Sequence, residues 1–245
     1  MTALYSWELL LLIFLMAMLY SSVGHGGASG YLAAMALFGL APQEMKAAAL
    51  VMNVFVAGLV LVRLSRVRRF PWCLFLPIMA ASLPMAFLGG MVQLEDHTYR
   101  YIVGGALVAA ALRFIFEARV AKAGKTPHWW LALAIGAALG LLAGMTGVGG
   151  GIYLSPLLLF LGWCTMRDSA AIAAAFIVLN SLAGLAGHGL AGGVWPPGIP
   201  WLVAVALAGA IVGSELLVRR FPAWRLRRLL GVVLVIAGVK MVLSA

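Results

Sequence analysis

The sequence predicts an all-α polytopic membrane protein built from two inverted-topology repeats. The prediction rests on an apolar composition, on long stretches without charge, and on a glycine-rich motif that occurs twice. Of the 245 residues, 64% are hydrophobic and 10% are charged, whereas about a quarter of the residues in a globular domain are charged. No Asp, Glu, Lys or Arg occurs in 9–43, 126–166 or 169–214. Such stretches lie in lipid or in protein surrounded by lipid, which argues against a soluble enzyme.

Six segments have the length and hydropathy of complete helical crossings, which need about 20 apolar residues each. The predicted helices are 43–64, 72–92, 98–116, 168–188, 199–218 and 225–243. Two other regions do not fit this simple pattern.

The first irregular region is the uncharged run from Leu9 to Gln43. As one helix it would be about 52 Å long, too long for one crossing and too short for two crossings with a turn. Four glycines between positions 24 and 30 lower the helix propensity, and the apolar piece Tyr31–Leu40 that follows spans only about half of the hydrocarbon layer. We therefore expect a broken, re-entrant element here.

The second irregular region repeats this pattern, with an apolar helix from about Trp129, the glycine-rich run Gly144–Gly151 and the short piece Ile152–Leu161. The helix after each break carries an asparagine, Asn53 or Asn180. Four glycine pairs share an offset of 123 residues, namely Gly24 with Gly147, Gly26 with Gly149, Gly27 with Gly150, and Gly39 with Gly162. The chain is thus predicted to be one integral-membrane domain of two transmembrane repeats, 1–124 and 125–245.

The basic residues lie in clusters beside the apolar segments. Such clusters set membrane orientation, so the net charge of +10 indicates topology and no nucleic acid partner. Thirteen of the 17 Lys and Arg residues belong to these clusters: Arg63, Arg66, Arg68, Arg69, Arg113, Arg119, Lys122, Lys125, Arg219, Arg220, Arg225, Arg227 and Arg228.

Equivalent loops of the two halves carry opposite charge bias. The loop after the Asn53 helix is basic, whereas the stretch 188–201 after the Asn180 helix is uncharged. By the positive-inside rule the two halves insert upside down relative to each other, as in many secondary transporters. We expect a multi-pass protein of the plasma (inner) membrane with loops 63–71, 113–128 and 219–228 in the cytoplasm and both termini outside. Each broken element is then a re-entrant hairpin.

The two breaks are expected to meet near the midplane and to bind an anion there. Irregular backbone is tolerated at this depth only where it is buried in protein or lines a wet cavity. Each short helix would direct its first N–H groups, with partial positive charge, into its break. Carboxylates and histidine clusters that would suit a cation are missing from the apolar segments, so we expect no metal, no cofactor and no catalytic residue. The predicted substrate-binding residues are Gly24, His25, Gly26, Gly27, Ser29, Asn53, Thr146, Gly147, Gly149, Gly150, Gly151, Asn180 and Ser181.

Other functions remain open. The string Gly27–Gly30 has the G-x-S-G form used by intramembrane serine proteases, with Ser29 as nucleophile and His188 as the candidate base. Ser29 corresponds to Ile152 in the second half, so the duplication preserves the backbone break and not a nucleophile. A cation channel and a purely structural membrane protein are the further alternatives.

Three more residue-level expectations follow from spacing. Glu215 lies four residues before Arg219, which favours an ion pair within one helix. Cys73 and Cys164 stand in apolar sequence without C-x-x-C spacing, so we expect two buried free thiols.

Two pairs of segments carry a family resemblance. Val23–Pro42 with Met45–Asn53, and Gly140–Trp163 with Ala170–Leu185, resemble the TauE/SafE sulfite exporter family, also called TSUP transporters. The resemblance covers essentially the whole chain. It implies a prokaryotic permease that exports sulfite, sulfonates or related small organosulfur anions, driven by a proton or electrochemical gradient. The implied partners are the anion, the lipid bilayer and coupling protons, and a homo-oligomer is left open.

Overall fold

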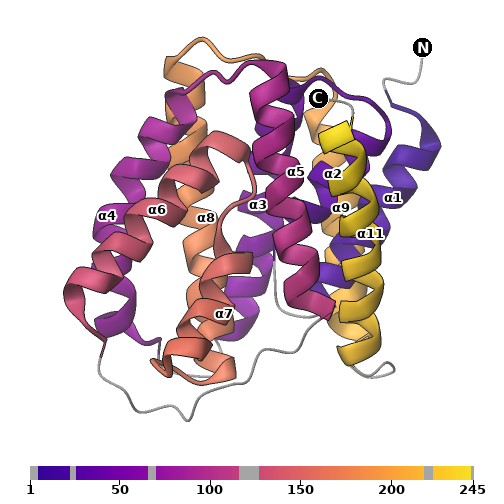
Figure 1. Ribbon diagram of the computed structural model, residues 1–245. Coiled ribbons are helices and arrows are strands. Elements are labelled where there is room, and N and C mark those ends of the chain that lie inside the picture. Colours follow the sequence, from indigo (N-terminus) through magenta and orange to yellow (C-terminus); the bar gives the residue numbers. More distant parts are fainter. Residues whose placement is uncertain (1–4, 23–25, 66–69, 116–126, 218–222, 244–245) are drawn as a thin grey trace.

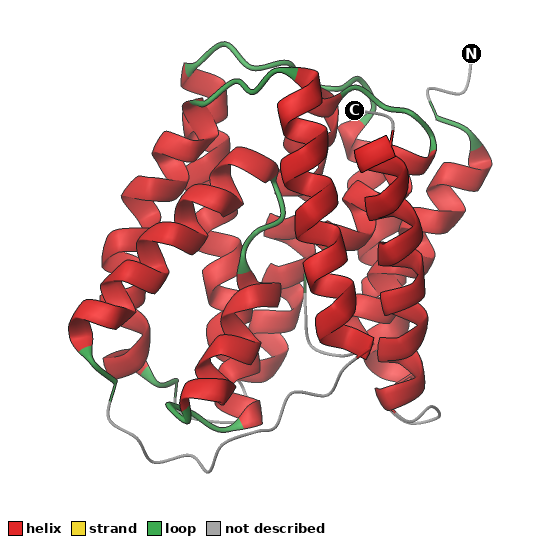
Figure 2. Ribbon diagram, in the orientation of Figure 1, coloured by secondary structure: helices red, strands yellow, loops and turns green. Residues whose placement is uncertain are grey.

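The computed structural model describes residues 5–22, 26–65, 70–115, 127–217 and 223–243, which form helices joined by turns (Figures 1 and 2). The described residues include four helices that are long and apolar enough to cross a membrane: α3, α4, α6 and α8. The predicted all-α polytopic class is confirmed, while the inverted relation of the two halves stays a prediction. In chain order the helices are α1 (Trp7–Ser22), α2 (Ala28–Leu37), α3 (Pro42–Ser65), α4 (Trp72–Met91), α5 (Asp96–Ile115), α6 (Trp129–Thr146), α7 (Gly151–Leu161), α8 (Met166–Leu190), α9 (Ile199–Val212), the π-helix η1 (Gly213–Leu217) and α11 (Ala223–Leu243).

Five of the six predicted complete helices match the observed bounds closely, and the sixth is interrupted. The predicted helix 199–218 is α9 followed at Gly213 by a π-helical turn. The hydroxyl of Ser214 donates to the Ala210 carbonyl at 2.7 Å, and such side-chain bonds one turn back loosen a helix. A Cβ at Gly213 would lie 2.0 Å from the Met18 carbonyl oxygen, so this turn also needs glycine for its contact with α1.

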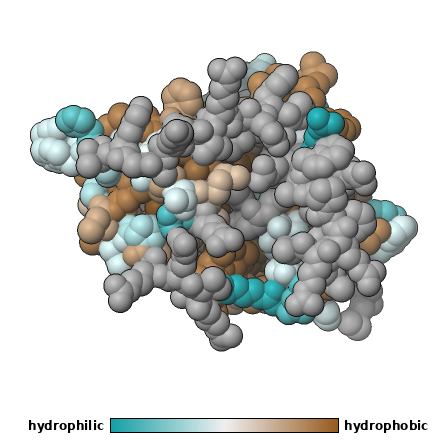
Figure 3. Space-filling view, turned by 90° about the horizontal axis from the view of Figure 1, so that it is seen from below, coloured by the Kyte–Doolittle hydropathy of each residue, from teal (hydrophilic) through white to brown (hydrophobic). Residues whose placement is uncertain are grey.

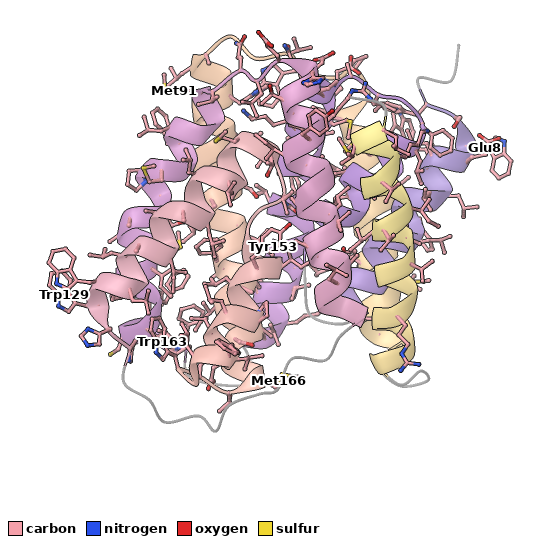
Figure 4. All side chains as sticks on the ribbon, viewed as in Figure 1. Glu8, Met91, Trp129, Tyr153, Trp163 and Met166 are labelled. Atoms are coloured by element: carbon pink, nitrogen blue, oxygen red, sulfur yellow. The ribbon has the colours of Figure 1, made fainter. Side chains whose placement is uncertain are left out.

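Helices α6 and α7 form a hairpin that enters the molecule and returns to the same end. Figure 4 places Trp129, the first residue of α6, and Met166, the first residue of α8, at the lower end of the view. Glu8 in α1 and Met91 at the end of α4 lie at the upper end. The halves therefore begin at opposite ends of the bundle, as an inverted pair would (Figure 1).

Helix α4 packs closely on α6 through a row of glycines. A Cβ built at Gly136, Gly140 or Gly144 would lie 2.1 to 2.3 Å from a main-chain oxygen of α4. Glycines at four-residue spacing let two helix backbones approach, as in small-xxx-small membrane interfaces. In the same way Gly209 of α9 meets the Phe14 carbonyl of α1. Helix α4 of the first half thus packs on α6, which belongs to the broken element of the second half. In the same way, α9 of the second half packs on α1, which belongs to the broken element of the first half.

The apolar core is consequently shared between the halves. One cluster of buried residues draws mainly on α1, α2, α3, α5, α9 and α11. The other draws on α4, α6, α7 and α8. Neither cluster is confined to one half of the chain.

Exposed tryptophans stand at both ends of the bundle. Trp72 and Trp129 begin α4 and α6 at the lower end, and at the other end Trp7 begins α1 and Trp201 lies in the first turn of α9. Seen from the lower end, hydrophilic residues stand beside apolar ones on the described surface (Figure 3). Aromatic belts at both water interfaces are typical of membrane proteins.

One expectation for a single residue is wrong, and another stays a prediction. Cys73 is exposed, so its predicted burial is wrong, because α4 turns this side of its first turn away from α6 and α8; Cys164 is buried as expected. Glu215 pairs with Arg63 of α3, with 2.9 Å between Oε1 and Nη2. Arg219, its predicted partner, lies outside the described residues.

Candidate functional site

The two glycine breaks meet at the side chain of Asn53. A Cβ at Gly26, in the first break, would lie 3.3 Å from Asn53 Oδ1, and one at Gly149, in the second break, would lie 2.8 Å from Nδ2. Both would also lie 3.2 Å from Cγ2 of Ile177. The backbone of each break therefore contacts the same amide on α3 and the same apolar side chain on α8. Gly24 and His25 of the predicted site lie outside the described residues.

The second break consists of glycines in the left-handed region. Gly147, which ends α6, has φ 81°, and Gly149 and Gly150 have φ 76° and 67°. Residues with a Cβ rarely adopt these angles, so glycine is needed for this path. Within the described part of the chain, the N–H groups of Gly149 and Gly150 have no hydrogen-bond acceptor. They stand free at the N-terminus of α7, where the helix dipole favours negative charge.

The first break ends in the same way. Gly27, the N-cap of α2, has φ 96°, and it corresponds to Gly150, the N-cap of α7, at the offset expected from the sequence. The hydroxyl of Tyr31 lies over Gly27 and donates to the Gly26 carbonyl at 2.9 Å. Tyr31 was not among the predicted site residues. A tyrosine in an apolar helix needs a partner for its hydroxyl, and this was the signal available in the sequence.

Three buried polar side-chain atoms have no partner among the described residues, and all three belong to predicted site residues. They are Oδ1 of Asn53, Nδ2 of Asn180 and Oγ of Ser181. All three residues are fully buried. Leaving a buried polar atom unpaired costs about 1–3 kcal/mol, so each of these atoms is a candidate contact for a ligand or an ordered water.

The remaining amide atoms of these asparagines are held in place. Asn53 Nδ2 donates to the Gly147 carbonyl at 3.4 Å, which joins α3 to the second break. Asn180 Oδ1 accepts from the hydroxyl of Ser82 on α4 at 2.8 Å. The free Nδ2 of Asn180 is thereby oriented as a donor.

The other predicted hydroxyls are engaged locally. Ser29 and Tyr20 share a hydrogen bond of 2.6 Å between their hydroxyl oxygens. Thr146 donates to the Leu142 carbonyl at 2.6 Å and accepts from the Val148 N–H at 3.2 Å. Gly151 is used for packing, because a Cβ there would lie 2.6 Å from Ile177. These residues shape the two breaks.

A cavity of about 370 Å³ adjoins the second break. It lies beside Gly150, between α5, α6 and α7, near Tyr153 at the centre of Figure 4. Its walls are mostly apolar, and the hydroxyl of Tyr153 is bonded to the Ala106 carbonyl of α5. The space between Gly26 and Gly149 is instead filled by Asn53 and Ile177, so the two breaks are closed against each other in this structure.

Two further residues that the sequence did not single out touch the second break. Lys46, on α3, packs its backbone against Gly147. Tyr99, on α5, donates its hydroxyl to the Thr146 carbonyl at 2.8 Å. An ionisable side chain in an apolar helix is a functional candidate by default, which was the available signal for Lys46.

The Ser29 and His188 side chains have different partners. Ser29 is bonded to Tyr20, whereas Nε2 of His188 lies 3.0 Å from the Val194 carbonyl and its ring packs edge-on to Trp195. This arrangement shows no activated serine.

Comparison with known proteins decides the family. Residues 9–241 match the family model described as "Sulfite exporter TauE/SafE". The chain belongs to the TauE/SafE sulfite exporter family. It is 35% identical over 233 residues to the "Probable membrane transporter protein y4hK" of Sinorhizobium fredii (strain NBRC 101917 / NGR234), covering 93% of this chain and 94% of that protein. No solved structure matches the chain. The protein is thus a multi-pass membrane protein of a transporter family, as the resemblance of its paired motifs implied.

Proposed function

We propose that this TauE/SafE protein is a permease that exports sulfite or a small organosulfur anion across the plasma membrane and binds it at the two glycine breaks. The proposal is supported by the unpaired buried atoms on Asn53, Asn180 and Ser181 together with the free backbone N–H groups of Gly149 and Gly150. As a permease it would move its solute without changing it.

The chemistry of the free groups favours an oxyanion. The Asn180 amide, the Ser181 hydroxyl and the N–H groups of Gly149 and Gly150 are neutral donors, and the short helices α2 and α7 add partial positive charge. The described residues contain no group of three or more His, Cys, Asp or Glu side chains that could hold a metal ion. Neutral donors bind sulfite or a sulfonate without the cost of a buried charge pair.

Transport requires the closed breaks to open. Asn53 and Ile177 lie between Gly26 and Gly149, so an anion reaches the free donors when the two repeats move apart around this contact. Rocking of one repeat against the other would open the site to each side in turn. With the basic clusters in the cytoplasm, the lower end of Figure 1 faces inward.

Substrate counterflow tests the proposal. Purified protein in proteoliposomes is loaded with sulfite, thiosulfate, sulfoacetate or acetate, and uptake of radiolabelled sulfite is followed. Asn180→Ala should raise the KM for sulfite about tenfold or more, because the free Nδ2 of Asn180 is a donor and a hydrogen bond to a charged group contributes roughly 1.5–3 kcal/mol. Asn53→Ala should also raise the KM, because Asn53 Nδ2 holds the Gly147 carbonyl of the second break in place. Unchanged transport in both variants contradicts the site, and uptake of K⁺ or Na⁺ without an anion would favour a cation channel.

His25 is the proposed carrier of a coupling proton, or a cationic partner of the anion, since imidazole changes charge near neutral pH. His25→Ala should then flatten the dependence of sulfite flux on pH. A pH profile that matches the wild type would remove His25 from the mechanism.

A further inference from the structure

Lys46 is a buried cation without a carboxylate partner in the described part of the chain. Its residue is 5% exposed and lies one turn inside α3. Its ammonium donates to three main-chain carbonyls at the end of α4, those of Gly89, Gly90 and Val92, at 3.3, 2.8 and 3.0 Å. The ion pair found among the described residues joins Arg63 and Glu215 instead. Carbonyl dipoles hold the ammonium but leave its net charge uncompensated.

The ammonium lies close to the second break. The end of α4 packs on the end of α6, where a Cβ at Gly144 would be 2.8 Å from the Gly90 nitrogen. A Cβ at Gly147 would lie 3.0 Å from the Lys46 carbonyl oxygen. Asn53 follows Lys46 by seven residues, which places both on one face of α3 about 10 Å apart. Lys46 therefore stands between the anion site and the upper end of the molecule.

A small hollow surrounds this position. Its volume is about 20 Å³, which is room for about one water molecule. Gln43, Gln93, Tyr99, Met145 and His188 line it together with Lys46. Tyr99 is bonded to the Thr146 carbonyl, so one wall of the hollow is continuous with the start of the second break. We refer to this space as the Lys46 hollow.

We propose that Lys46 attracts the substrate anion as the anion moves between the upper face and the two breaks, and that the Lys46 hollow is the entrance to the anion site. This role rests on the proposed anion transport. A unit charge about 10 Å away, at an effective dielectric constant of about 20, changes the affinity for a monovalent anion by roughly tenfold. Lys46 would thus set the anion selectivity that neutral donors alone provide only weakly.

Lys240 supplies a matched control. Its ammonium also donates to the last carbonyl of a helix, that of Leu37 in α2, at 2.6 Å, but it is exposed at the end of α11. Both lysines therefore cap a helix C-terminus with a positive charge. The two differ in burial and in distance from the second break.

The test measures uptake of radiolabelled sulfite by full-length protein in proteoliposomes. Lys46→Met should raise the KM about tenfold, Lys46→Arg should stay within about threefold of wild type, and Lys240→Met should leave the KM unchanged. A wild-type KM in Lys46→Met overturns the proposal. A role limited to capping α4 predicts a lower melting temperature in detergent with no change in KM.

Gln93→Glu keeps the test valid if Lys46→Met does not fold. Gln93 is exposed on the wall of the Lys46 hollow and donates to the Ala191 carbonyl at 2.8 Å. A carboxylate here opposes the Lys46 charge while the three bonds to α4 stay intact. The KM should rise several-fold in Gln93→Glu and stay at the wild-type value in the uncharged Gln93→Met. Equal KM values in the two variants overturn the proposal.

The outcomes separate this inference from the function on which it rests. If wild-type protein moves sulfite and the Asn53 and Asn180 variants are impaired, an unchanged Lys46→Met overturns the role of Lys46 alone. If wild-type protein moves none of the four anions, the proposed function fails and the role of Lys46 fails with it.

Discussion

Asn53 and Asn180 follow the breaks of the two halves but meet different neighbours. The Asn53 amide lies between backbone from both breaks, whereas the Asn180 amide is held by Ser82 of α4 and keeps a free donor. Asn53 therefore closes the contact between the breaks as well as offering an acceptor. Asn180 serves as an oriented donor.

Substitution of Gly149 should abolish transport because its Cβ would meet Asn53. Gly39 is a matched control, with φ 73° against 76° at Gly149 and no atom within 4 Å of an added Cβ. Ala at either position adopts a left-handed conformation that costs about 1–2 kcal/mol. At Gly149 the Cβ would also lie 2.8 Å from Asn53 Nδ2. We expect Gly149→Ala to lose at least tenfold in sulfite flux, while Gly39→Ala shows only a slightly lower melting temperature.

Flux and melting temperature measured on the same reconstituted samples decide this point. Equal flux in the two variants would mean that the contact at Asn53 has no part in transport.

At the scale of the helices, some glycines interrupt a helix and others let two helices pack closely. The run at 147–150 ends α6 and leaves the N–H groups of Gly149 and Gly150 free, while the row at Gly136, Gly140 and Gly144 brings α6 against α4. These two uses differ in backbone conformation: the second break is left-handed, and the α6 row is helical.

Gly140→Ala should destabilise the protein, and Gly58→Ala should not. A Cβ at Gly140 would lie 2.3 Å from the Ser82 carbonyl oxygen, whereas one at Gly58 in α3 meets nothing within 4 Å. Overpacking of this kind costs about 1–3 kcal/mol, and Gly→Ala in an open helix position gains about 0.5–1 kcal/mol. Thermal unfolding in detergent checks the sign of both changes. A Gly140→Ala protein as stable as wild type would contradict the close packing of α4 on α6.

The sequence predicted the helices and both breaks but not their partners. Hydropathy and the paired glycines were enough to predict the two helix interruptions, because an apolar run of the wrong length must break where helix propensity falls. The row at Gly136, Gly140 and Gly144 indicates a close helix contact, yet its spacing contains no information about which helix approaches. The role of Lys46 depends on the end of α4, which is distant in sequence.

Some residues of the candidate site could be predicted from the sequence, but their bonding partners could not. Asn53 and Asn180 were predicted because both follow a break, and folding packs their helices, α3 and α8, side by side. The local bonds of Ser29 and Thr146 could not be predicted, since a hydroxyl in a helix can bond either a neighbouring carbonyl or a ligand.

For the whole molecule, orientation in the membrane can be tested with the native cysteines. Cys73 is exposed at the lower end, beside the basic cluster that begins at Arg63. Cys164 lies in the turn between α7 and α8, where burial and then the Asp168 charge raise the pKa of its thiol to about 11, so it stays protonated near pH 7.5. A membrane-impermeant maleimide should label Cys73 in inside-out vesicles and not in right-side-out vesicles.

Cys73→Ser is the control for this experiment and should remove the label, since Cys164 reacts only after denaturation. Labelling of Cys73 in right-side-out vesicles would place the basic end of the bundle outside and reverse the proposed topology.

The packing of helices from one half on helices of the other half also affects how the protein is assembled in the membrane. Helix α4 packs against α6 and α8, and both of these helices are synthesised after it. The face of α4 at Gly89 and Gly90 is therefore exposed to the translocon or to lipid until α6 and α8 have been inserted. The fragment 1–124 made alone would keep this face uncovered and become a substrate for membrane proteases. Synthesis of both fragments in one cell would let them anneal into the native bundle.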